Sequence, residues 1–161
     1  MERLTSFERV KTSLEHKEPD RVPFDLGSTA VTGINIHALR GLKRYLGLSD
    51  KVSLRNKITQ VGHVEDDLIN KLGIDIKRVA PSPSSVQGLE RELGIEDGYD
   101  HIQDEWGMGW RMPLEGGIYY DLYHSPLSAA ETVKDIERYP WPDALDPKRY
   151  IDLKANADRV V

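Results

Sequence analysis

Only two short runs of this chain have the apolar pattern of strands that lie between helices, and this small number limits what it can fold into. Residues 21–27 place Val22, Phe24 and Leu26 on one face. Residues 74–79 form the second run, directly after a predicted helix. A closed barrel of parallel strands needs eight of them and typically about 250 residues. With 161 residues, the chain can supply only the first part of such an architecture.

Most other apolar positions before residue 81 recur at helical spacing. They predict helices over residues 5–18, 36–46 and 54–72. The first helix is predicted to begin with a capping box, because Thr5 and Glu8 have the required spacing. The third is predicted to end at Gly73, since glycine readily adopts the left-handed conformation that closes a helix.

Residues 82–127 lack both patterns and are rich in aromatic side chains. A tryptophan-containing stretch, 104–111, and a tyrosine-containing stretch, 118–122, predict a β-hairpin or small antiparallel sheet with its turn at 114–117. Farther on, Ser128 and Glu131 have capping-box spacing, and Pro147 suits the first position of a last helix. We divide the single segment into helices and first strands (1–81), a β-rich insert (82–127) and helices (128–161).

The composition excludes several classes of protein. The net charge is −5 and no run of basic residues exceeds two, so a nucleic-acid partner is not expected. There is no cysteine, which excludes disulfides and thiolate metal sites in this segment. No stretch has the apolar character of a signal peptide or a membrane span, which predicts a cytoplasmic protein without a membrane partner.

Four stretches carry a resemblance to a known family. They are Phe7-Glu8-Arg9-Val10 with Pro19-Asp20-Arg21-Val22-Pro23; Leu68-Ile69-Asn70-Lys71-Leu72-Gly73-Ile74-Asp75; Asp104-Glu105-Trp106-Gly107 with Tyr120 and Pro126-Leu127; and Tyr139-Pro140-Trp141-Pro142-Asp143 with Asp146-Pro147. In this order they resemble the start of uroporphyrinogen decarboxylase superfamily proteins. The resemblance implies an α/β fold, the N-terminal part of a (β/α)₈ TIM barrel with N-terminal helices and a small antiparallel β insert.

One difference from the family indicates which branch the chain resembles. The decarboxylases have an arginine-rich segment after the first strand, which binds the substrate's carboxylates, but residues 27–31 contain no arginine. The Asp104-Glu105-Trp106-Gly107 stretch is more similar to the cobalamin-dependent methyltransferases. For the intact enzyme this branch implies zinc, held by His and Cys ligands, and methylcobalamin or another corrinoid. Since the chain has no cysteine, that zinc site is not in this segment. We expect the segment by itself to bind no cofactor.

Asp75 is the expected catalytic residue. The resemblance implies that it holds or protonates substrate at the end of a strand. The alternative from the residues alone is a strand-edge carboxylate paired with Lys77 or Arg78.

Four further residues are expected to bind substrate. Asp25, Ser28 and Thr29 follow the first predicted strand, where a barrel places its active-site loops, with a turn or helix cap as the alternative. Trp106 is expected to line a pocket for substrate, with packing in the small sheet as the alternative.

The resemblance therefore predicts methyl transfer involving a corrinoid, with the segment alone inactive. The alternatives are a uroporphyrinogen decarboxylase of tetrapyrrole biosynthesis, and a non-catalytic assembly or binding fragment. The expected partners are a small-molecule substrate, a corrinoid protein, and either the remainder of the barrel or a second copy in a homo-oligomer. The methyl donor and acceptor stay open.

Overall fold

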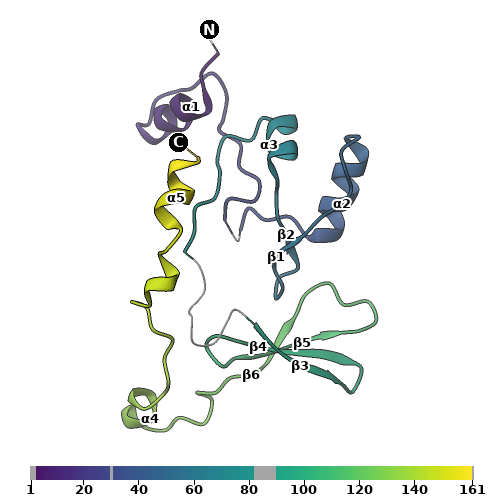
Figure 1. The fold of residues 1–161 in the computed structure, drawn as a ribbon, viewed down its shortest axis with the longest axis vertical. Coiled ribbons are helices and arrows are strands. Elements are labelled where there is room, and N and C mark those ends of the chain that lie inside the picture. Colours follow the sequence, from purple (N-terminus) through teal and green to yellow (C-terminus); the bar gives the residue numbers. More distant parts are fainter. Residues whose placement is uncertain (1–2, 30, 82–89, 161) are drawn as a thin grey trace. The chain divides into compact units, whose positions relative to one another are not determined.

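The computed structural model describes residues 3–29, 31–81 and 90–160 (Figure 1). The chain forms two compact units. Unit 1 consists of Met1–Asn56 and Gln60–Val79, and unit 2 consists of Lys57–Thr59 and Ala80–Val161.

Unit 1 contains three helices and a two-stranded antiparallel sheet. These are α1 (Ser6–Leu14), α2 (Ile36–Tyr45), α3 (Asp66–Leu72), β1 (Leu54–Asn56) and β2 (Val61–Gly62). Its core is formed by Leu39 of α2 and Leu68 of α3, both fully buried, together with Val64 and Ile74. Two further leucines of the predicted apolar stripe, Leu42 and Leu46, pack against this core.

Two of the predicted helix ends are confirmed. The Thr5 amide donates to Glu8 Oε2 at 2.9 Å and the Glu8 amide donates to Thr5 Oγ1 at 3.2 Å, which completes the capping box of α1. Gly73 closes α3 with a φ of 65°, in the left-handed region that glycine tolerates.

The predicted helix over residues 54–72 is wrong in its first half. Residues 54–62 form β1, a turn and β2, and only residues from Asp66 onward are helical. A reason lies at Gly62, where an added Cβ would stand 2.5 Å from Leu39 Cδ2. Because α2 packs directly on this glycine, tertiary contact decides a conformation that apolar spacing alone leaves ambiguous.

The two predicted strands of unit 1 are also wrong. Residues 21–27 and 74–79 are not assigned to any strand. One backbone hydrogen bond links them, from the Asp75 amide to the Phe24 carbonyl at 2.8 Å. The Phe24 amide donates instead to Asp75 Oδ2, at 2.9 Å. A side chain thus takes the place of a backbone acceptor at this point, and the two runs do not form a ladder.

Unit 2 is built on a four-stranded antiparallel sheet in chain order: β3 (Glu90–Glu96), β4 (Tyr99–Asp104), β5 (Gly109–Pro113) and β6 (Asp121–His124). The predicted antiparallel pairing across the glycine-rich turn is confirmed as β5 with β6. Ile102 of β4 is fully buried and lies opposite Trp110 of β5. β3 and nearly all of β4 precede the hairpin that was predicted within the β-rich insert, residues 82–127.

The segment after the sheet contains α4 (Val133–Glu137), a 3₁₀ helix (Pro147–Arg149) and α5 (Leu153–Asp158). The predicted capping box at Ser128 and Glu131 is wrong. The box lies four residues later, where Thr132 and Asp135 cap α4. Both pairs have the same spacing, so the spacing alone could not choose between them.

The predicted fold class is contradicted. Among residues 3–29, 31–81 and 90–160 every paired strand is antiparallel, in one two-stranded and one four-stranded sheet. This is not the pattern of a barrel fragment, which alternates parallel strands with helices. In the same residues, no helix combines the length and apolar character that crossing a membrane would require.

Candidate functional site

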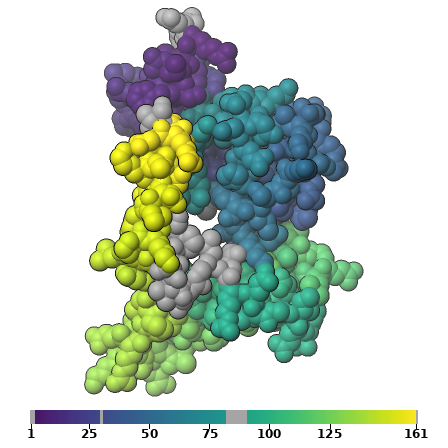
Figure 2. Space-filling model, in the orientation of Figure 1, coloured from purple at the N-terminus to yellow at the C-terminus, as the bar shows by residue number. Residues whose placement is uncertain are grey.

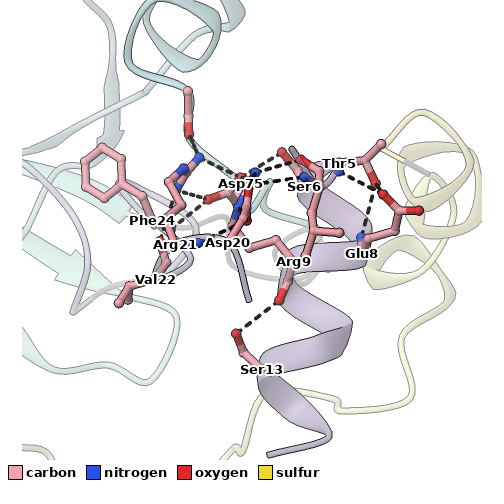
Figure 3. Close-up of polar contacts among 12 residues, drawn as sticks. Thr5, Ser6, Glu8, Arg9, Ser13, Asp20, Arg21, Val22, Phe24 and Asp75 are labelled. Carbon is pink, nitrogen blue, oxygen red and sulfur yellow. Dashed lines mark hydrogen bonds and ion pairs between the residues drawn. The ribbon is translucent and has the colours of Figure 1, made fainter. Parts of the chain in front are cut away.

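Asp75 lies at the centre of a buried network of charges in unit 1 (Figure 3). Its carboxylate is fully buried. Oδ1 accepts hydrogen bonds from Ser6 Oγ at 2.8 Å, Arg9 at 2.6 Å and Arg21 at 3.0 Å. Oδ2 accepts from Arg21 at 2.7 Å and from the Phe24 amide at 2.9 Å. These donors occupy the acceptor positions that a carboxylate offers.

The second carboxylate of the network belongs to Asp20. Arg9 donates to both of its oxygens, at 2.7 and 2.8 Å, in the fork geometry that guanidinium and carboxylate favour. The side chain of Arg9 is 3% exposed, although α1 is otherwise a surface helix. Arg9 therefore connects Asp20 and Asp75, and we name Ser6, Arg9, Asp20, Arg21 and Asp75 the Asp75 cluster.

The network sets the protonation of both carboxylates. The hydrogen bonds from Arg9 hold the pKa of Asp20 well below its usual range. Burial acts to raise the pKa of Asp75, but its hydrogen bonds from Phe24, Ser6, Arg21 and Arg9 together outweigh burial, and the pKa is lowered. Both groups are therefore ionised at neutral pH.

We expect unit 1 to lose stability as the pH falls below about 4. An aspartate in an unfolded chain titrates near about 3.9, and both carboxylates of the cluster titrate lower in the fold. Their contribution is thus fully present above the unfolded pKa and is lost as the pH falls through the folded pKa. The effect is measured as the denaturant concentration at which unit 1 is half unfolded, determined by NMR at several pH values from about pH 6 to about pH 2. Asp20→Asn should flatten the profile, and an equally steep profile in that variant would contradict the assignment to the cluster.

The structure places the catalytic candidate Asp75 in this network, where it pairs with Arg9 and Arg21. The alternative pairing with Lys77 or Arg78 is not observed, since Lys77 instead pairs with Asp66 at 2.7 Å. The catalytic role of Asp75 stays a prediction.

The other candidates of unit 1 lie together in one loop. Asp25 accepts hydrogen bonds from the amide and the hydroxyl of Ser28. The Thr29 hydroxyl lies 2.9 Å from that of Thr32. Arg55 donates to the carbonyls of Gly27 and Thr29, at 2.6 and 2.8 Å. The polar side chains thus hold the loop in shape, and their role in binding substrate stays a prediction.

Trp106 belongs to unit 2, in a tight turn between β4 and β5. Asp104 holds this turn: its Oδ1 accepts from the amides of Trp106 and Met108, both at 2.9 Å, and its Oδ2 accepts from the indole of Trp110 at 2.8 Å. The Trp106 ring is 48% exposed and stands edge-on to Trp141, with centroids 6.2 Å apart. Trp106 thus packs against another tryptophan of the same unit. Its role in binding substrate stays a prediction.

A pocket of about 500 Å³ lies beside this turn. We name it the Gly107 pocket. It is lined by Arg91, Gln103, Asp104, Gly107, His124, Pro126, Tyr139 and Pro140. Gly107 has a φ of 73°, and an added Cβ would stand 2.5 Å from the Tyr139 hydroxyl. Glycine at this position therefore keeps both the turn and the space beside Tyr139 open.

Tyr139 links the turn to the chain that follows α4. Its hydroxyl donates to the Trp106 carbonyl. Burial raises the pKa of Tyr139, and the charge of Asp104 raises it further, so the hydroxyl keeps its proton at neutral pH. Its ring packs edge-on against Trp141 at 4.9 Å. The tyrosine thus forms a fixed wall of the pocket.

Sequence reasoning missed most of these residues. Arg9, Asp20 and Arg21 stand in a stretch quoted for the resemblance, but no local pattern shows that they meet Asp75 more than fifty residues later. Arg91 lies within residues 82–127, which have neither the helical nor the strand pattern of apolar residues. Asp104 did carry a signal, since an aspartate two residues before a Trp-Gly pair is typical of a side chain that bonds its own turn.

Comparison with known protein families, curated proteins and solved structures finds no match to this chain. Within the described ranges, no group of three or more His, Asp or Glu side chains is arranged to hold a metal ion. The sequence has no cysteine, so it cannot supply the mixed His and Cys ligands that the resemblance implies for zinc. The residues of this chain therefore do not fit that zinc site.

Proposed function

We propose that this chain is part of a methyltransferase-like enzyme of the uroporphyrinogen decarboxylase superfamily, and that the Gly107 pocket binds its small-molecule substrate. One observation supports the proposal above others. Two separate stretches that carry the resemblance meet at this pocket: Asp104 and Gly107 come from one, and Tyr139 and Pro140 from the other. Its volume of about 500 Å³ is in the range of small-molecule sites, about 300–1,000 Å³.

The walls of the pocket suit a ligand with an apolar body. Pro126, Pro140 and the Tyr139 ring offer apolar surface, which lies beside the polar side chains of the other walls. In the intact enzyme, the corrinoid would carry the methyl group. This chain's contribution is then to bind and orient the other reactant. A decarboxylase would instead need cationic groups for several carboxylates, and of the lining residues only Arg91 is a permanent cation.

The proposal predicts that one class of methyl donor or acceptor binds in the pocket. The four classes that the family resemblance implies are a thiol, an amine, an aryl ether and a pterin. They are represented by 2-mercaptoethanol, methylamine, anisole and tetrahydrofolate, and saturation-transfer NMR on the chain detects binding of each. Gly107→Ala should weaken the binding, because its Cβ meets the Tyr139 hydroxyl. Gly116→Ala is the matched control: its φ of 71° carries the same backbone strain, yet nothing lies within 4 Å of an added Cβ. If no class binds, or if both variants weaken binding equally, the proposal fails.

A second candidate function, an assembly module, is favoured by exposed apolar side chains. On α1, Phe7 is 72% exposed and Leu14 is 76% exposed, and Ile151 before α5 is 74% exposed. Figure 2 shows α1 (purple) and α5 (yellow) at the molecular surface. Light scattering after size-exclusion chromatography discriminates the two candidates: a stable dimer dissociated by Phe7→Glu supports assembly, and a monomer at all concentrations contradicts it.

A further inference from the structure

The polar groups lining the Gly107 pocket divide into those already bonded and those still available. Asp104 accepts three hydrogen bonds from its own turn and from Trp110. Gln103 donates to the Gly107 carbonyl at 3.2 Å, and Tyr139 donates to the Trp106 carbonyl. These three side chains therefore use their polar groups in hydrogen bonds that hold the walls of the pocket in place.

Two other side chains that line the pocket, those of Arg91 and His124, have polar groups available for a ligand. Among the described residues, the guanidinium of Arg91 and the ring nitrogens of His124 form no hydrogen bond or ion pair. Both residues are exposed, and both line the pocket. Arg91 lies on β3 opposite Gln103 of β4, and His124 ends β6 opposite Gly109. The strands thus direct two groups able to donate hydrogen bonds toward one pocket, so the complementary ligand is rich in acceptors.

We propose that the Gly107 pocket binds the carboxylate of a small monoanionic acid, with the Arg91 guanidinium as the main donor and a ring N–H of His124 as the second. A guanidinium presents two parallel N–H groups that match the two oxygens of a carboxylate. The apolar body of the acid lies against Pro126, Pro140 and the ring of Tyr139.

The charges of the pocket favour a monoanion over a phosphate. Arg91 carries the only permanent positive charge among the lining residues, and Asp104 adds a negative one. Either anion would face Asp104, but a dianionic phosphate brings one more negative charge than the single guanidinium can match, whereas one carboxylate is matched by it. The inference rests on the proposed role of the pocket as a ligand site, and it adds the chemical class of the ligand.

The test uses benzoate, its neutral isostere benzamide and inorganic phosphate, titrated into the ¹⁵N-labelled chain. We expect benzoate to shift the amide signals of Gly107 and Met108, and to bind at least about tenfold more tightly than benzamide or phosphate, because it alone forms the charge-assisted pair. Arg91→Gln should lower benzoate affinity by about the same factor. Arg40→Gln removes the same charge from an exposed site on α2 and should leave it unchanged.

Four results would overturn the inference, and they differ in what else they affect. Equal binding of benzoate and benzamide would refute the carboxylate while leaving the pocket as a ligand site. Tighter binding of phosphate would replace the carboxylate by a phosphate. Shifts that are absent with all three probes would also count against the proposed function, whereas equal losses in Arg91→Gln and Arg40→Gln would show only a general effect of charge.

Discussion

Asp75→Asn should lower the free energy of unfolding of unit 1 by about 3 kcal/mol, the lower end of the cost of breaking a buried ion pair. The lower end applies because Arg21, one of the two guanidinium partners, is 41% exposed and can be solvated in the variant. Arg9 is only 3% exposed and would keep Asp20 as its one carboxylate partner. Amide hydrogen exchange at Leu39 and Leu68, in the core of unit 1, measures the loss. Tryptophan fluorescence does not, since Trp106, Trp110 and Trp141 all belong to unit 2.

Asp66→Asn is the matched control for this substitution. Asp66 also forms an ion pair, with Lys77 at 2.7 Å, but its side chain is 74% exposed. Exposed pairs contribute about 0–1 kcal/mol, so exchange at Leu39 and Leu68 should change little. Equal effects of Asp66→Asn and Asp75→Asn would show that burial of the Asp75 cluster has no energetic consequence.

Ile102→Ala should destabilise unit 2 by about 2–5 kcal/mol, the usual cost of truncating a buried isoleucine. Ile102 is the one fully buried large side chain among the described residues of this unit. It lies opposite Trp110, so the tryptophan emission reports the transition during denaturant unfolding. A small sheet has little other buried apolar area to compensate for the cavity.

Ile95→Ala makes the same chemical change on β3, where the side chain is 70% exposed. It should change the free energy of unfolding by no more than about 0.5 kcal/mol. If Ile95→Ala and Ile102→Ala unfolded at the same denaturant concentration, Ile102 would not be part of a packed core.

Local features of the fold followed from the sequence alone. Thr5 and Glu8 predicted the start of α1, and Gly73 predicted the end of α3. The paired aromatic stretches around two glycines predicted the β5–β6 pairing. Each of these involves residues close in the chain, so its energy depends little on the remainder of the fold.

The candidate site was predictable only in part. Asp104 and Gly107 stood out as a motif, but their meeting with Arg91, Tyr139 and Pro140 is a property of the folded unit. Asp75 was singled out from the sequence as a carboxylate of interest, while its partners were not foreseen.

Tertiary structure decided what the chain's local pattern left ambiguous. An alternation of apolar residues is compatible with a strand, but a strand also needs a partner that offers backbone groups along its length. The Phe24 amide donates its hydrogen bond to the side chain of Asp75, which Arg9 and Arg21 hold in place, and not to a backbone carbonyl. The sequence by itself therefore determined caps, turns and one hairpin. Only the folded chain decided that residues 21–27 and 74–79 meet through a buried carboxylate, because that arrangement depends on Arg9 of α1, which lies outside both runs.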